Sequence, residues 1–144
     1  MIKSLNHIAI IVSCEEALDF YLRLGFKEIS REVKPEKGYT CLFFRDEHGI
    51  TLEIFIKDGP DHMNNPETRG LRHLSFDIDS AEEIEKLLEG YEVQKRYTMP
   101  NGKKIVFIYD YDKQPVEFAE IGSVNVWFMN MILKEFALST IHLI

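Results

Sequence analysis

Two histidines and two glutamates recur at matched places in the chain, and side chains of these types can bind a divalent metal ion. His7 precedes Glu53 by 46 residues, and His73 precedes Glu117 by 44 residues. Imidazole suits Zn, Ni, Co and Fe, and carboxylates help to neutralise the charge of the ion. Each residue taken alone is more often a structural histidine or a solvated carboxylate. The recurrence of the same two types in the same order favours a metal site.

The elements around these residues also recur, so the chain is an internal repeat. Residues 6–10 align with residues 72–76. A Ser-x-x-Glu capping box follows each run and predicts a helix start. Apolar residues at helical spacing come next, and a glycine ends each predicted helix because it accepts the left-handed conformation. The capping boxes are Ser13…Glu16 and Ser80…Glu83, the helix faces are Ala17, Leu18, Tyr21, Leu24 and Ala81, Ile84, Leu87, Leu88, and the glycines are Gly25 and Gly90.

Three strand-like stretches complete each half and bring a glutamate into the last one. They span residues 27–33, 39–45 and 50–57 in the first half, and residues 92–99, 103–109 and 115–121 in the second. Turn residues separate them. Asp46 precedes Glu53 by seven residues, and Asp110 precedes Glu117 by seven. Each half is therefore predicted to run strand, helix, strand, strand, strand, with a polar linker at residues 59–70 between the halves.

Alternation along the strands predicts the face on which each residue lies. Leu74, Phe76 and Ile78 share one face, which fits packing under a helix. In the last strand of each half, the glutamate points opposite to its apolar neighbours. The four candidate ligands, His7, Glu53, His73 and Glu117, thus fall on the face away from the helices, and Phe55, Ser75 and Asp77 share it.

Length and composition exclude several classes of protein. The 144 residues allow one domain, and 45% hydrophobic residues suffice for a packed core. A formal net charge of −7 argues against nucleic-acid binding and against docking on an anionic membrane. Cys14 and Cys41 form no CxxC motif, and no signal peptide is apparent. These features predict free thiols and a cytoplasmic protein.

The sequence resembles the vicinal oxygen chelate superfamily, which includes glyoxalase I, methylmalonyl-CoA epimerase, extradiol dioxygenases and fosfomycin and bleomycin resistance proteins. The resemblance covers about residues 5–121. It rests on the runs at residues 7–10, 20–26, 51–55, 70–76 and 110–118. Of these, the Phe-Tyr-x-x-Leu-Gly-Phe helix end is specific for the modules of this superfamily. It implies an α+β fold in which two βαβββ modules, residues 1–58 and 71–121, form an incompletely closed, eight-stranded barrel-like sheet in a single domain.

The resemblance also implies a function. The family's ligand positions map onto His7, Glu53, His73 and Glu117, a set that looks like that of glyoxalase I. The implied cofactor is Ni, Zn, Co or Mn. The implied activity is that of a lyase or isomerase that stabilises an enediolate formed from a small 2-oxoaldehyde–thiol adduct or a related oxygen-chelating substrate. Glu117 would act as the catalytic base and Glu53 on the opposite face of the same carbon. Glutathione-contacting residues are not recognisable.

Other readings stay open at this point. The chain could be a non-catalytic binding protein that sequesters an antibiotic, an acyl-CoA epimerase or a thiol transferase on the same scaffold. The family resemblance implies a homodimer, with the site either within one chain or shared between two. Arg45, Arg72, Tyr97, Lys103 and Lys104 are weak candidates for substrate contacts.

The C-terminal extension at residues 122–144 has no counterpart in the first half. It is predominantly apolar, and Lys134 and Glu135 are its only charged residues. This adjacent pair argues against a transmembrane helix. We expect the extension to pack as a helix or added strand on the barrel or on a dimer partner.

Overall fold

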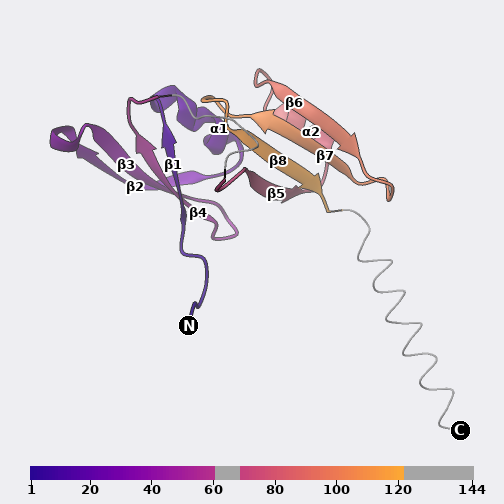
Figure 1. Ribbon diagram of the computed structural model, residues 1–144, viewed down its shortest axis with the longest axis horizontal. Coiled ribbons are helices and arrows are strands. Elements are labelled where there is room, and N and C mark those ends of the chain that lie inside the picture. Colours follow the sequence, from indigo (N-terminus) through magenta and orange to yellow (C-terminus); the bar gives the residue numbers. More distant parts are fainter. Residues whose placement is uncertain (61–68, 122–144) are drawn as a thin grey trace, which may run out of the picture.

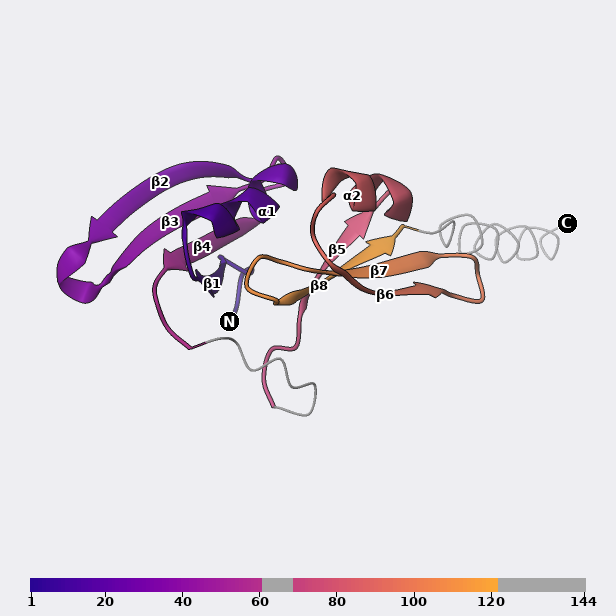
Figure 2. The same ribbon diagram turned by 90° about the horizontal axis from the view of Figure 1, so that it is seen from above.

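The computed structural model describes residues 1–60 and 69–121, which form two four-stranded sheets lying side by side (Figures 1 and 2). The first sheet has the order β1-β4-β3-β2 and the second the order β5-β8-β7-β6. Their strands are β1 (Ile8–Val12), β2 (Lys27–Lys34), β3 (Tyr39–Arg45), β4 (Thr51–Ile56), β5 (Leu74–Ile78), β6 (Val93–Thr98), β7 (Lys104–Tyr109) and β8 (Pro115–Glu120).

The two sheets share one topology, which confirms the predicted repeat and the α+β class. In each module the first strand pairs in parallel with the last, and the other neighbours are antiparallel. Every predicted strand is present. The three later strands of each module have bounds within one residue of those expected, whereas β1 and β5 lie two residues further along the chain than the runs at residues 6–10 and 72–76. The sheets are not closed into a barrel, which is consistent with the incompletely closed arrangement.

The helix of the first module begins differently from the prediction. A 3-10 turn, η1 (Glu15–Ala17), precedes α1 (Leu18–Arg23), and the N-cap residue is Cys14 with no side-chain capping bond. The Ser13 capping box is therefore wrong. Instead, the Ser13 amide donates a 2.9 Å hydrogen bond to Asp112 of the second module. The sequence could not reveal this competing acceptor, because it lies 99 residues away.

The helix of the second module, α2 (Ala81–Leu87), has the predicted cap. Ser80 accepts a hydrogen bond from the Glu83 amide, as an N-cap serine should. Of the predicted apolar face, Ala81, Ile84 and Leu88 are buried, whereas Leu87 is 46% exposed. The prediction for Leu87 is wrong because α2 is short and only one side of it meets the sheet. A second 3-10 turn, η2 (Pro35–Lys37), links β2 to β3.

Gly25 ends α1 as the sequence predicts. Its φ of +92° is left-handed, a conformation that glycine adopts without strain. The amides of Gly25 and Phe26 donate to the carbonyls of Leu22 and Tyr21, respectively. This is a Schellman ending, and it turns Phe26 into the core, where only 4% of the residue is exposed.

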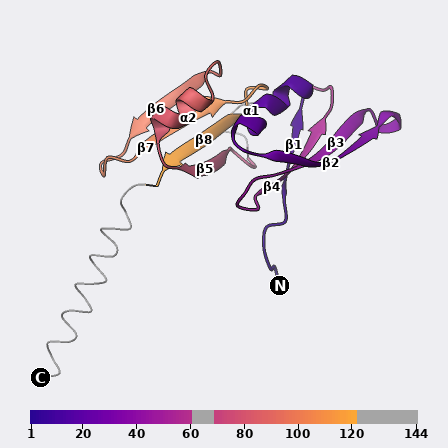
Figure 3. The same ribbon diagram turned by 180° about the vertical axis from the view of Figure 1, so that it is seen from behind.

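The two modules are joined by one continuous hydrophobic core around α1. Phe20 of α1 contacts Tyr91 and Phe118 of the second module, with ring centroids 5.0 and 6.4 Å apart. Phe26 similarly meets Phe76 at 6.1 Å. Figures 1 and 3 show α1 at the junction of the two sheets. The helix face of each sheet is consequently buried, and the opposite face is left for a site.

No helix within residues 1–60 and 69–121 is long and apolar enough to cross a membrane. Residues 61–68 of the predicted linker lie outside the described residues. The C-terminal extension at residues 122–144 also lies outside them, so its predicted packing stays a prediction.

Candidate metal centre

His7 and Glu53 form the first candidate pair of ligands. His7 immediately precedes β1, and Glu53 lies in β4, which pairs with β1 in parallel. His7 Nε2 is 3.3 Å from Glu53 Oε2, and the side chains are 35% and 21% exposed. His7 Nδ1 lies 2.7 Å from Asn6 Oδ1, a contact that orients the ring with Nε2 toward Glu53. In its neutral form, His7 would present Nε2 as a ligand atom beside the Glu53 carboxylate.

His73 and Glu117 repeat this geometry in the second module. His73 immediately precedes β5, and Glu117 lies in β8. His73 Nε2 is 3.2 Å from Glu117 Oε2, and the side chains are 25% and 20% exposed. Ser75 of β5 donates to the other carboxylate oxygen at 2.9 Å. This hydrogen bond fixes the rotation of the Glu117 carboxylate and leaves Oε2 on the side of His73.

Both pairs fit a divalent metal ion. At metal–ligand distances of about 2.1 Å, two adjacent ligands in tetrahedral or octahedral geometry lie about 3.0–3.4 Å apart. The two N–O separations, 3.3 and 3.2 Å, match this range. Neutral imidazole and carboxylate are also the donors that Zn, Ni, Co and Mn accept.

A phenylalanine from the neighbouring strand orients each imidazole, a contact that the sequence analysis missed. Phe43 of β3 meets His7 edge to face at 5.8 Å, and Phe107 of β7 meets His73 at 5.2 Å. Each phenylalanine is in register with the glutamate of its own module. The signal was present in the sequence, because strand alternation in β3 and β7 places both rings on the ligand face.

Cys41 supports Glu53 from β3 in a way that resembles the role of Ser75. Its Sγ donates to Glu53 Oε1 at 3.6 Å. Burial, followed by this hydrogen bond to the carboxylate, raises the pKa of the Cys41 thiol. The thiol therefore stays protonated near neutral pH and acts as a donor rather than as a ligand.

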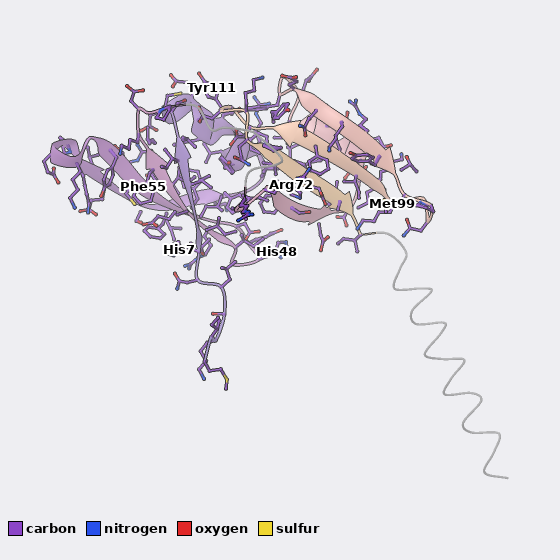
Figure 4. The ribbon with its side chains drawn as sticks, viewed as in Figure 1. His7, His48, Phe55, Arg72, Met99 and Tyr111 are labelled. Atoms are coloured by element: carbon purple, nitrogen blue, oxygen red, sulfur yellow. The ribbon has the colours of Figure 1, made fainter. Side chains whose placement is uncertain are left out.

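The single chain does not bring the two pairs together. Among the residues that the structure describes, no group of three or more His, Cys, Asp or Glu side chains could hold a metal ion. Each module thus presents half of the predicted set. Figure 4 labels His7 on the first module and Arg72, which directly precedes His73, on the second.

The five candidates for substrate contacts differ in how near they lie to the candidate ligands. Tyr97 lies on the ligand face, where its ring meets Phe107 at 6.2 Å. Arg45 donates to Thr51 at 3.1 Å, and Lys104 pairs with Glu82 of α2. Arg72 and Lys103 are exposed and half-buried, respectively, and neither has an ion pair within the described residues. Within the described residues, Tyr97 is connected to His73 through the ring of Phe107, which contacts both side chains.

Comparison with known families assigns the chain to a superfamily. Residues 4–118 match the model of the Glyoxalase/Bleomycin resistance protein/Dioxygenase superfamily. The chain belongs to this superfamily, which confirms the resemblance found in the sequence.

Similar proteins support the same assignment. The uncharacterized protein YwkD of Bacillus subtilis (strain 168) is 36% identical over 126 residues, which are 83% of this chain and 98% of YwkD. A glyoxalase family protein from Enterococcus faecalis is 35% identical, with a TM-score of 0.72 over 82% of this chain and 98% of that chain. The fosfomycin resistance protein FosX from Listeria monocytogenes, solved with Mn(II) and sulfate, shares the fold with 21% identity and a TM-score of 0.62, over 83% and 93% of the chains.

Proposed function

We propose that the protein is a metal-dependent lyase or isomerase of the glyoxalase I type, and that its complete site forms between two copies of the chain. The observation that carries the proposal is the repeated pair of ligands. His7 with Glu53 and His73 with Glu117 have matching separations of 3.3 and 3.2 Å on matching faces. A single His–Glu side-chain pair is common in proteins. The same pair found at matching positions in both halves of an internal repeat is not.

The four side chains would have two roles, metal binding and proton transfer. His7 and His73 would hold the metal ion together with the two glutamates. A bound divalent ion supplies Lewis-acid stabilisation of the anion that forms when a proton leaves the carbon beside a carbonyl. Glu117 would remove that proton, and the hydrogen bond from Ser75 would hold its carboxylate in place for this step. In the glyoxalase-type reaction Glu117 would then give the proton to the neighbouring carbon, and the hydroxyl proton would move to the oxygen of that carbon. Glu53 would face the first carbon from the opposite side, where its protonated form would supply the proton in an epimerase-type reaction.

The substrate class follows from this division. A 2-oxoaldehyde–thiol adduct offers two neighbouring oxygens, one carbonyl and one hydroxyl, and an acidic C–H bond on the carbon beside the carbonyl. Proton transfer between the two carbons would convert such an adduct into a 2-hydroxy thioester with no external oxidant. An acyl-CoA epimerase would use the same carboxylates but return the proton to the carbon from which it came.

The packing of the modules supports a site that two copies share. The core around α1 fixes the modules side by side, and the two ligand pairs stay separate within one chain. A two-fold symmetric dimer would place the first module of each copy against the second module of the other. It would contain two equivalent sites of four ligands. The proposed location is the cytoplasm, where Cys14 and Cys41 stay reduced.

Mixing two inactive variants tests the shared site. One variant carries His7→Ala with Glu53→Gln, and the other carries His73→Ala with Glu117→Gln. In a mixed dimer, one site loses all four ligands and the other keeps all four. Random exchange should therefore restore about a quarter of the wild-type metal content and turnover. A control sample that contains only one of the two variants should recover neither metal content nor turnover.

Elemental analysis tests the function more directly. The purified wild-type protein should contain about one Ni, Zn, Co or Mn per chain. Glu117→Gln should lower turnover of a 2-oxoaldehyde–thiol adduct by at least about a hundredfold, because it removes the base. A metal-free protein that still binds a small molecule would instead indicate a sequestering protein. If the mixed variants recover no metal content or turnover while the wild type contains its full metal, the site would lie within one chain.

A further inference from the structure

Lys95 lies on the ligand face of the second sheet because of a β-bulge. The register of β6 against β7 shifts between Val93 and Lys95. Val93 packs against the core on the helix side, so strict alternation would also send Lys95 to that side. The bulge inserts Gln94 and aligns Lys95 with Phe107 instead. Arg96, the next residue, returns to the helix side and pairs with Glu85 of α2.

The Lys95 ammonium is held over aromatic rings that also contact a candidate ligand. Its Nζ lies 4.7 Å from the ring centroid of Phe107 and 5.2 Å from that of Tyr97. Both distances fall within the range of cation–π attraction. Phe107 in turn meets His73 edge to face at 5.2 Å. Lysine, phenylalanine and histidine thus form one continuous contact series across the sheet.

No carboxylate within the described part of the chain forms an ion pair with Lys95. The neighbouring cations of this module differ in this respect. Arg96 pairs with Glu85, and Lys104 pairs with Glu82. A half-buried ammonium that has only π partners retains strong attraction for an anion, because ring faces neutralise less charge than a carboxylate does.

We infer that Lys95 binds an anionic group of the substrate, so that the substrate is an oxygen-chelating compound that carries a second, negatively charged group. This inference rests on the proposed function. Lys95, Phe107, Glu117 and Ser75 lie in one register row across β6, β7, β8 and β5. Two strand spacings separate Lys95 from Glu117, which is about 10 Å between Cα atoms. A small molecule that chelates at His73 and Glu117 would cross Phe107 and reach the ammonium with its charged end.

The first module has no equivalent cation in this place. Its β2 strand has a bulge between Glu28 and Ser30, which aligns Ser30 with Phe43. The corresponding row of the first sheet therefore ends in a neutral hydroxyl. Each complete site would consequently have one anion subsite, on the side of Glu117. This asymmetry would orient the substrate and decide which glutamate acts first on the reacting carbon.

Two matched probes test the subsite. One is the monohydroxamate of glutaric acid, which carries a chelating hydroxamate and a carboxylate. The other replaces the carboxylate by a carboxamide and is neutral at that end. Calorimetry on the full-length, Mn-loaded protein should show about tenfold tighter binding of the carboxylate probe, as expected for a charge-assisted hydrogen bond. Lys95→Met should reduce this ratio to about one, and Lys95→Arg should keep most of it.

Lys86 provides the control, since it is exposed at the end of α2 on the helix side. Lys86→Met should leave the ratio at about ten. Unchanged binding of the neutral probe to Lys95→Met would show that this variant is folded and metal-loaded. Equal binding of both probes to the wild type would overturn the subsite while leaving the metal site intact. Binding of neither probe would overturn the metal site and the subsite together.

Discussion

Tyr21 Oη donates a 2.8 Å hydrogen bond to Asp110 Oδ2, and this buried bond joins the helix of one module to the β7–β8 turn of the other. The residues are 1% and 5% exposed. Asp110 Oδ1 meanwhile accepts from the amides of Asp112 and Gln114. The same carboxylate therefore shapes the turn that precedes the Glu117 strand and holds α1 in place.

Tyr21→Phe should destabilise the protein by about 2 kcal/mol at neutral pH, because it leaves a buried carboxylate oxygen without its donor. Burial raises the pKa of Asp110, and the Tyr21 hydrogen bond partly opposes this increase. Loss of the hydroxyl should therefore raise that pKa further. The cost should be largest above the titration range of Asp110 and should shrink as the pH falls through it, since the carboxyl is then protonated in both proteins. Denaturant unfolding at several pH values measures this.

Tyr91→Phe is the matched control for that experiment. Tyr91 Oη donates to Asp19 at 3.0 Å, but this hydrogen bond is only partly buried, and Arg23 also pairs with Asp19. We expect a loss of about 0.5 kcal/mol. A larger effect for Tyr91→Phe than for Tyr21→Phe at neutral pH would contradict the assigned role of Tyr21.

The two turn aspartates should differ in their importance. Asp46 Oδ1 accepts from the amides of His48 and Ile50, just as Asp110 Oδ1 accepts from amides in its own turn. Asp46→Ala should therefore cost about 1 kcal/mol. Asp110→Ala should cost about 3 kcal/mol, because it also strands the buried Tyr21 hydroxyl. Thermal and denaturant unfolding of both variants would show equal losses if the link between modules contributed nothing.

The helix caps give a second pair of variants. Ser80→Ala should cost about 1 kcal/mol, because Ser80 accepts from the Glu83 amide. Ser13→Ala should change stability by less than about 0.3 kcal/mol, since the Ser13 contact to Asp112 uses its backbone amide. Comparable losses for the two serines in urea unfolding would mean that the first capping box forms in solution.

Ser75→Ala should weaken metal binding by about tenfold, because it frees the Glu117 carboxylate to rotate. Ser75→Thr keeps the hydroxyl and should restore most of the affinity. Competition with a chromophoric chelator measures both values. Ser30→Ala is the control, since Ser30 is exposed on the edge strand β2. The role of Ser75 would be disproved by equal affinities of the Ser75→Ala and Ser30→Ala proteins.

The periodicity of the sequence predicts much of the secondary structure of this protein and the face on which its candidate ligands lie. The repeat, the strands and the side of the sheet that holds His7, Glu53, His73 and Glu117 all follow from spacing that is visible in the sequence. The reason is that alternation along a strand and the left-handed glycine at a helix end depend on neighbouring residues alone. The second capping box could be predicted for the same reason.

Tertiary structure decided how these parts combine. The Ser13 amide donates to Asp112 instead of forming the predicted capping box. Phe20 and Tyr21 pack against the second module, and in this arrangement the described residues contain no group of three or more of the candidate ligands. The bulge that turns Lys95 toward the ligand face is likewise invisible to alternation, because it depends on the register that β6 adopts against β7. Contacts between distant segments, which no local pattern encodes, thus decided what each predicted site residue faces.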